Sequence, residues 1–153
     1  MSDLEVKIVR LDPMRVASTY GFGTEPEGIA WDKMKAFAEK NGMGSGEDLR
    51  TFGFNNPDPS PASPNYGYEI WLEVGPELQP DDDIRIQTFN GGLYGVTQFK
   101  NLNKIGEVWK QLVRWREDSK YKIGHHQWLE ELLNSTDVPI EEYVFNLYIP
   151  IVE

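Results

Sequence analysis

Few residues in this chain have the types and spacing that catalysis or metal binding needs. His125 and His126 are the only histidines, and neighbours in a strand point to opposite faces, so the two cannot hold one metal together. We interpret them as part of a polar turn, with a metal site as the alternative. The chain has no cysteine, no glycine-rich phosphate loop with its lysine and no Gly-x-Ser-x-Gly sequence. Thiol catalysis and zinc–cysteine sites are therefore excluded, and we predict neither a cofactor nor a metal.

Glu130 has a setting that suggests ligand binding. If residues 127–134 form a strand, Glu130 shares a face with Trp128 and Leu132. A carboxylate in an apolar row is costly unless it is paired or meets a cation, to which aromatic rings add cation–π contacts. The same segment also fits a short amphipathic helix, with Glu130 and Glu131 in solvent. Periodicity leaves both interpretations open.

Trp71 raises the same question in another strand. It lies between Glu69 and Glu73, on the face opposite to a row of large apolar residues at positions 68, 70, 72 and 74. That row should pack under the helices, so we expect Trp71 to be exposed on the uncovered face. It could serve a ligand there, or cover a neighbouring strand or a dimer contact. Trp31 and Tyr143 are further candidates if that face curls into a pocket.

Short strands and two helices must position these residues. Alternation and breakers predict strands over residues 4–10, 14–22, 49–55, 66–74, 84–89, 94–100, 127–134 and 141–151, and helices over about 27–41 and 103–120. Thr24 to Glu27 has the form of a capping box, and residues 56–64 form a proline-rich loop. Asn90-Gly91-Gly92 predicts a hairpin between the two strands beside it.

The order strand–helix–strand–strand occurs twice, around residues 14–74 and 94–151. Many short strands with two helices indicate an α+β domain, in which an antiparallel sheet is covered on one face. The uncovered face is then polar or a ligand surface.

Composition limits the class of protein. The 153 residues suit one domain, and 25 acidic against 15 basic residues leave a net charge of −10, which disfavours nucleic acid. Nineteen residues are aromatic (five Trp, seven Tyr and seven Phe), more than a core alone calls for. We see no membrane-spanning stretch and no secretory signal, and we expect a cytoplasmic protein.

Several stretches, in their order along the chain, resemble the GyrI-like small-molecule-binding family. That family includes the effector-binding domains of AraC-type and MerR-type multidrug regulators and the DNA-gyrase inhibitory protein. The stretches are an aromatic strand running into an Asn-Pro-Asp loop (52–61), the next strand (66–74), a glycine turn (91–96), an aromatic-Glu strand (128–134) and the closing strand (141–151).

The resemblance implies an α+β fold of two strand–helix–strand–strand halves, which form one concave antiparallel sheet with two helices on its outer face. It implies that residues 127–134 are a strand and that Glu130 is the glutamate of a pocket between the halves. It also places the family's helix aromatic on Trp31 and its last-strand tyrosine on Tyr143, positions that contact flat lipophilic cations in drug-binding members. Trp71 is added from alternation alone. Residues 1–153 would form a single effector-binding domain without a DNA-binding domain.

We therefore predict a stand-alone protein that binds a hydrophobic, cationic, drug-like small molecule. Glu130 would neutralise its charge, and Trp31, Trp71 and Tyr143 would stack against its flat body. One alternative is a hydrolase of electrophilic, cyclopropane-bearing compounds, in which the pocket glutamate activates water. Another is a ligand-responsive partner of a transcription regulator or of DNA gyrase, and a homodimer also fits.

Overall fold

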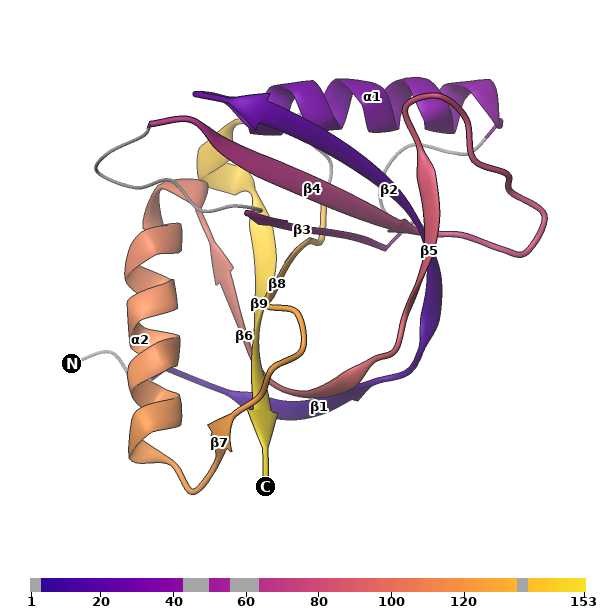
Figure 1. The fold of residues 1–153 in the computed structure, drawn as a ribbon. Helices are drawn as coiled ribbons and strands as arrows, with labels where there is room; N and C mark the ends of the chain where they lie inside the picture. Colours follow the sequence, from indigo (N-terminus) through magenta and orange to yellow (C-terminus); the bar gives the residue numbers. More distant parts are fainter. Residues whose placement is uncertain (1–3, 43–49, 56–63, 135–137) are drawn as a thin grey trace. The chain divides into compact units, whose positions relative to one another are not determined.

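The computed structural model describes residues 4–42, 50–55, 64–134 and 138–153. The chain divides into two compact units. We call Met14–Phe89 the central unit, and Met1–Pro13 together with Asn90–Glu153 the terminal unit. In the part of the chain that the structure describes, each unit combines antiparallel strands with one long helix (Figure 1).

The central unit is a four-stranded antiparallel sheet with the strand order β3-β4-β2-β5. Its elements are β2 (Met14–Gly23), α1 (Pro26–Lys40), β3 (Thr51–Asn55), β4 (Tyr66–Glu73) and β5 (Arg85–Phe89). β2 pairs with β4 over eight residues, Val16 facing Glu73 and Gly23 facing Tyr66. This register fixes which side chains of β2 and β4 share a face.

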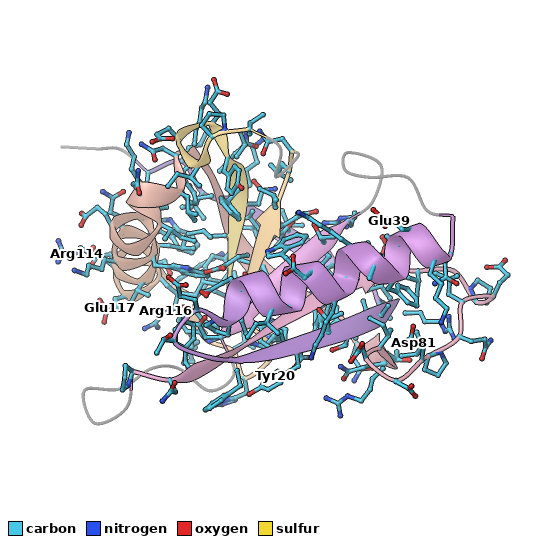
Figure 2. The ribbon with its side chains drawn as sticks, turned by 90° about the horizontal axis from the view of Figure 1, so that it is seen from above. Tyr20, Glu39, Asp81, Arg114, Arg116 and Glu117 are labelled. Carbon is cyan, nitrogen blue, oxygen red and sulfur yellow. The ribbon has the colours of Figure 1, made fainter. Side chains whose placement is uncertain are left out.

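Helix α1 covers one face of this sheet (Figure 2). Ala30, Met34 and Phe37 recur at helical spacing and pack against Ile70 and Leu72 of β4 in one buried cluster. The helix also comes close to β2, because a Cβ added at Gly21 would lie 2.4 Å from the backbone oxygen of Pro26. Only glycine fits there.

The strands of the terminal unit are also antiparallel, in the order β1-β6-β9-β8, and β7 is paired with β9. Its elements are β1 (Lys7–Leu11), β6 (Gly92–Lys100), the 3-10 helix η1 (Leu102–Lys104), α2 (Ile105–Asp118), β7 (Lys122–Ile123), β8 (Leu129–Leu132), the 3-10 helix η2 (Ile140–Glu142) and β9 (Val144–Val152). Val108 and Leu112 are the buried residues of α2. Gly95 of β6 leaves room for the ring of Trp115, which a Cβ would meet at 2.6 Å.

The α+β class is confirmed. The repeated order is also confirmed, as β2-α1-β3-β4 and β6-α2-β8-β9, with the two-residue strand β7 inserted between α2 and β8. The ambiguous segment around Glu130 is strand β8. The proline-rich loop lies largely outside the described residues, which resume at residue 64. None of the described helices is long and apolar enough to cross a membrane.

Two local predictions were wrong. The strands on either side of Asn90-Gly91-Gly92 do not pair with each other: β5 pairs with β2, whereas β6 pairs with β1 and β9. Gly91 has a φ of 77° and packs against the backbone of Leu11. The glycines therefore let the chain pass close to that backbone, and they do not form a hairpin. At the start of α1, the N-cap residue is Glu25, which makes no side-chain capping bond in the described structure.

Candidate functional site

Alternation gives each sheet two faces. One faces the unit's own helix, and we call the side away from it the helix-free face. In the central unit the register brings Ser18, Phe52 and Trp71 to one row of the helix-free face, and Phe54 and Glu69 to the next. The residues of β4 between them, Ile70 and Leu72, pack under α1.

Glu69 is the charged centre of this helix-free face. Its carboxylate is buried, with 5% of the residue exposed. Oε2 accepts hydrogen bonds from Trp71 Nε1 at 2.6 Å, Ser18 Oγ at 3.0 Å and Gln87 Nε2 at 3.1 Å. These donors come from β4, β2 and β5, so the sheet register itself assembles the site. An indole, a hydroxyl and an amide therefore donate hydrogen bonds to one carboxylate oxygen.

The Trp71 ring that donates to this carboxylate packs against two other aromatic rings. The Trp71 indole lies edge-on to Phe54 at 4.9 Å between centroids and tilted against Phe89 at 5.3 Å. Trp71 is only 8% exposed, so our expectation of an exposed ring was wrong. Its placement on the face away from α1 agrees with the alternation. The ring is buried because the sheet brings other aromatic residues beside it, which β4 alone does not reveal.

This face already holds one cation–π contact. The guanidinium carbon of Arg50 lies 5.0 Å from the ring centroid of Phe52, and Phe52 faces Trp71 across the strand pair. Rings on this face can therefore present their negative π surfaces to a cation.

In the terminal unit, Glu130 and Glu131 point to opposite faces of β8. The Glu130 carboxylate accepts a hydrogen bond from Trp109 Nε1 of α2 at 3.1 Å, on the helix side. Glu131 lies on the helix-free face and is 5% exposed. The Tyr148 hydroxyl donates to its Oε1 at 2.5 Å. Each unit thus has a buried carboxylate on its helix-free face, with an aromatic donor on it.

A hollow of about 640 Å³ opens on the helix-free face of the terminal unit. Strands β1, β6 and β9 supply nearly all of its lining: Glu5, Lys7, Val9, Val96, Gln98, Phe99, Lys100, Val144, Asn146 and Tyr148. A volume of this size lies within the range of small-molecule sites.

The structure places the four predicted site residues in different surroundings. Trp71 lies on a helix-free face. Trp31, on α1, is half-buried and packs against the apolar cluster between α1 and the central sheet. Tyr143 precedes β9, and its ring lies 6.2 Å from that of Phe145, a residue on the helix side of the terminal sheet. Glu130 lies on the same helix side.

Sequence reasoning missed Glu69 and Glu131. A signal for Glu69 existed, because alternation puts it on the same face as Trp71. For Glu131 the signal was the placement of two consecutive glutamates in one strand, which must lie on opposite faces. To tell which of Glu130 and Glu131 lies on the helix-free face, one must know which face of β8 is covered by α2.

The histidines differ in exposure. His125 is exposed, whereas the ring of half-buried His126 lies with Nε2 2.7 Å from the backbone oxygen of Leu93. Among the described residues, no three His, Asp or Glu side chains are grouped so that they could hold a metal ion.

Comparison with known proteins places this fold in a class. The model of the GyrI-like small molecule binding domain matches residues 4–152. A protein of antiparallel strands and two long helices with this match is a small-molecule-binding domain. The chain belongs to the GyrI-like family.

Solved structures share the fold at low sequence identity. The C-terminal domain of EcmrR has a TM-score of 0.74 at 13% identity, covering 98% of both chains. In the EcmrR–DNA complex the TM-score is 0.75 at 12% identity, and the match covers 97% of this chain but 57% of EcmrR. SAV2435 bound to tetraphenylphosphonium has a TM-score of 0.62 at 10% identity, covering 97% and 94%. A hydrolase from Listeria innocua has a TM-score of 0.67 at 8% identity, covering 99% and 94%. No curated protein sequence matches this chain.

Proposed function

We propose that this GyrI-like domain binds a flat, lipophilic, cationic small molecule and that the helix-free face of its central unit supplies the charge recognition. The observation that carries the proposal is Glu69, a buried carboxylate that accepts hydrogen bonds from Trp71 and Ser18 and faces Phe54 across the strand pair. A buried negative charge attracts a cation more strongly than an exposed one, because solvent screens it less.

Aromatic side chains add to this selectivity. Trp71 and Phe54 lie beside the carboxylate, and Phe89 packs on Trp71. The Arg50–Phe52 contact is an internal example of a cation on this face. A delocalised cation loses less hydration than a compact ammonium when it leaves water, so it suits such a setting. The fold shared with SAV2435, whose structure contains tetraphenylphosphonium, supports the same ligand class.

Glu69→Gln tests the assignment. Glutamine keeps an acceptor oxygen for Trp71 and Ser18 but removes the charge. We expect affinity for tetraphenylphosphonium to fall about tenfold, equivalent to about 1.4 kcal/mol, with little change for neutral triphenylphosphine oxide. Glu73→Gln, an exposed glutamate of the same strand, is the matched control and should bind like the wild type. Isothermal titration calorimetry measures all three, after thermal unfolding has shown that each variant is folded.

Glu130→Gln is measured in the same series, because a ligand contact by Glu130 stays a prediction from the sequence. Ligand contacts by Trp31 and Tyr143 also stay predictions. An equal loss in Glu69→Gln and Glu73→Gln would contradict the assignment to Glu69. A loss confined to Glu130→Gln would move the charge recognition to β8 of the terminal unit.

Hydrolysis is a second candidate, which Ser18 favours. Its hydroxyl shares Oε2 of Glu69 with the Trp71 indole, so a polar group and a carboxylate able to orient or deprotonate a water lie together. The fold is also that of a Listeria innocua protein described as a hydrolase. Formation of a hydrated product from an electrophilic cyclopropane compound, detected by mass spectrometry and lost in Glu69→Gln, would favour catalysis. Action with a protein partner, such as a regulator or DNA gyrase, stays a prediction.

A further inference from the structure

The hollow of the terminal unit is built from side chains that the cation proposal does not use. Lys7 of β1 is paired with Val96 of β6, and Lys100 of β6 is paired with Val144 of β9. Strand alternation puts all four on the helix-free face, and all four line the hollow. Lys100 lies four residues beyond Val96, so the two lysines stand about 13 Å apart along the sheet.

The charge of this lining is opposite to that of the molecule. Lys7, Lys100 and Glu5 are its charged residues, which leaves one net positive charge. The whole chain carries −10. Both lysines are exposed, so their ammonium groups can meet a ligand while their stems cover apolar surface.

The rest of the lining is amphipathic. Val9, Val96 and Val144 form an apolar floor, and Gln98 and Asn146 face each other across β6 and β9 with amide groups that donate and accept. Tyr148 closes this side with an aromatic ring, and its hydroxyl is already engaged with Glu131. Such a surface suits a flat hydrocarbon body that carries an anionic group.

We propose that this hollow is a second ligand site, specific for an amphipathic organic anion such as an aromatic carboxylate. The hydrocarbon part packs on the three valines and Tyr148, the carboxylate meets the ammonium of Lys7 or Lys100, and the amides of Gln98 and Asn146 bind polar substituents. This site goes beyond the proposed cation binding, since it lies in the other unit and selects the opposite charge.

Three probes of one shape test the charge preference. These are 2-naphthoate, neutral 2-naphthamide and 2-naphthylmethylammonium, each titrated into the full ¹⁵N-labelled chain. We expect 2-naphthoate to bind most tightly and to shift the amide signals of β1, β6 and β9. Equal binding of naphthoate and naphthamide, or shifts confined to other strands, would overturn the proposal.

Substitutions that remove a positive or a negative charge from the lining test the same charge preference. Lys7→Gln and Lys100→Gln should each weaken 2-naphthoate binding about twofold to fivefold, as expected for partly exposed ion pairs. Lys100→Arg should restore it, and Glu5→Gln should tighten it. Lys110→Gln, an exposed lysine on α2, is the matched control and should leave affinity unchanged. Lysine variants that bind like Lys110→Gln would overturn the assignment.

One variant distinguishes the proposed cation site from the proposed anion site. Loss of tetraphenylphosphonium binding in Glu69→Gln leaves naphthoate binding untouched if the sites are distinct. A parallel loss of both ligands in Glu69→Gln would contradict a separate anion site in the terminal unit.

Discussion

At the scale of single residues, each unit buries a carboxylate on its helix-free face and satisfies it with a different aromatic side chain. The Glu69 carboxylate meets the indole of Trp71, and that of Glu131 meets the hydroxyl of Tyr148. In both, an aromatic donor satisfies a buried carboxylate on the helix-free face, which lowers the cost of burying the charge. The aromatic excess of the composition therefore has a polar as well as an apolar role.

Tyr94 gives a residue-scale prediction about pH. It is fully buried, and its hydroxyl donates to the backbone oxygen of Gln127 at 2.5 Å. Burial, with Tyr148 as a second cause, raises the pKa of Tyr94 well above its ordinary value. The folded state therefore favours the neutral phenol, and its contribution to stability is complete below pH about 10 and is lost as the pH rises further.

Tyr94→Phe should remove that dependence. We expect it to lower the free energy of unfolding by about 1 kcal/mol at pH 7, the usual effect of losing one hydrogen bond. Between pH 7 and pH 11 the difference between wild type and variant should shrink, as followed by urea denaturation. Tyr121→Phe is the control from the same unit. A difference that stays constant over this range would contradict the role of Tyr94.

At the scale of elements, alternation predicted the faces of strands well, and it predicted their partners poorly. The strands, both helices and the repeated order follow from patterns of apolar residues along the chain. The partner of β5 could not be predicted from these patterns. Asn90-Gly91-Gly92 is equally suited to a hairpin and to a close approach of the backbone to Leu11. The candidate site depends on partners, since Glu69 draws its three donors from three strands.

The dependence on contacts between distant elements also explains why the sequence pointed to Glu130 and missed Glu131. Alternation predicted that Trp128 and Glu130 share a face, and Trp109 contacts both of them from α2. The sequence pattern does not tell which face of β8 that helix covers. Packing of α2 against β6 and β9 settles it, and those contacts join residues far apart in the chain.

The docking of α1 gives an element-scale prediction. Gly21→Ala should destabilise the protein by about 1–3 kcal/mol, because its methyl group would meet the backbone at Pro26, which cannot rotate away. Gly28→Ala is the matched control, since a Cβ there meets nothing within 4 Å and alanine favours the helix. Thermal unfolding should show a lower melting temperature for Gly21→Ala and an equal or higher one for Gly28→Ala. Equal melting temperatures for both variants would contradict this packing.

At the scale of the whole molecule, the net charge of −10 should assist the binding of cations. Long-range attraction is screened beyond a Debye length, which is about 10 Å at 0.1 M salt and about 3 Å at 1 M. We therefore expect affinity for tetraphenylphosphonium to fall as sodium chloride rises from 10 mM to 0.5 M. Affinity for triphenylphosphine oxide should not fall with it. Equal salt dependence of the two ligands would show that charge has no part in the binding.

The preference of the wild-type protein between these two ligands at one fixed salt concentration tests whether the protein recognises lipophilic cations. Calorimetric titrations with tetraphenylphosphonium and with triphenylphosphine oxide compare bodies of similar shape that differ in charge. We expect saturable binding of the cation, at least tenfold tighter than binding of the neutral oxide. Equal affinity, or no binding of the cation, would contradict a function in recognising lipophilic cations.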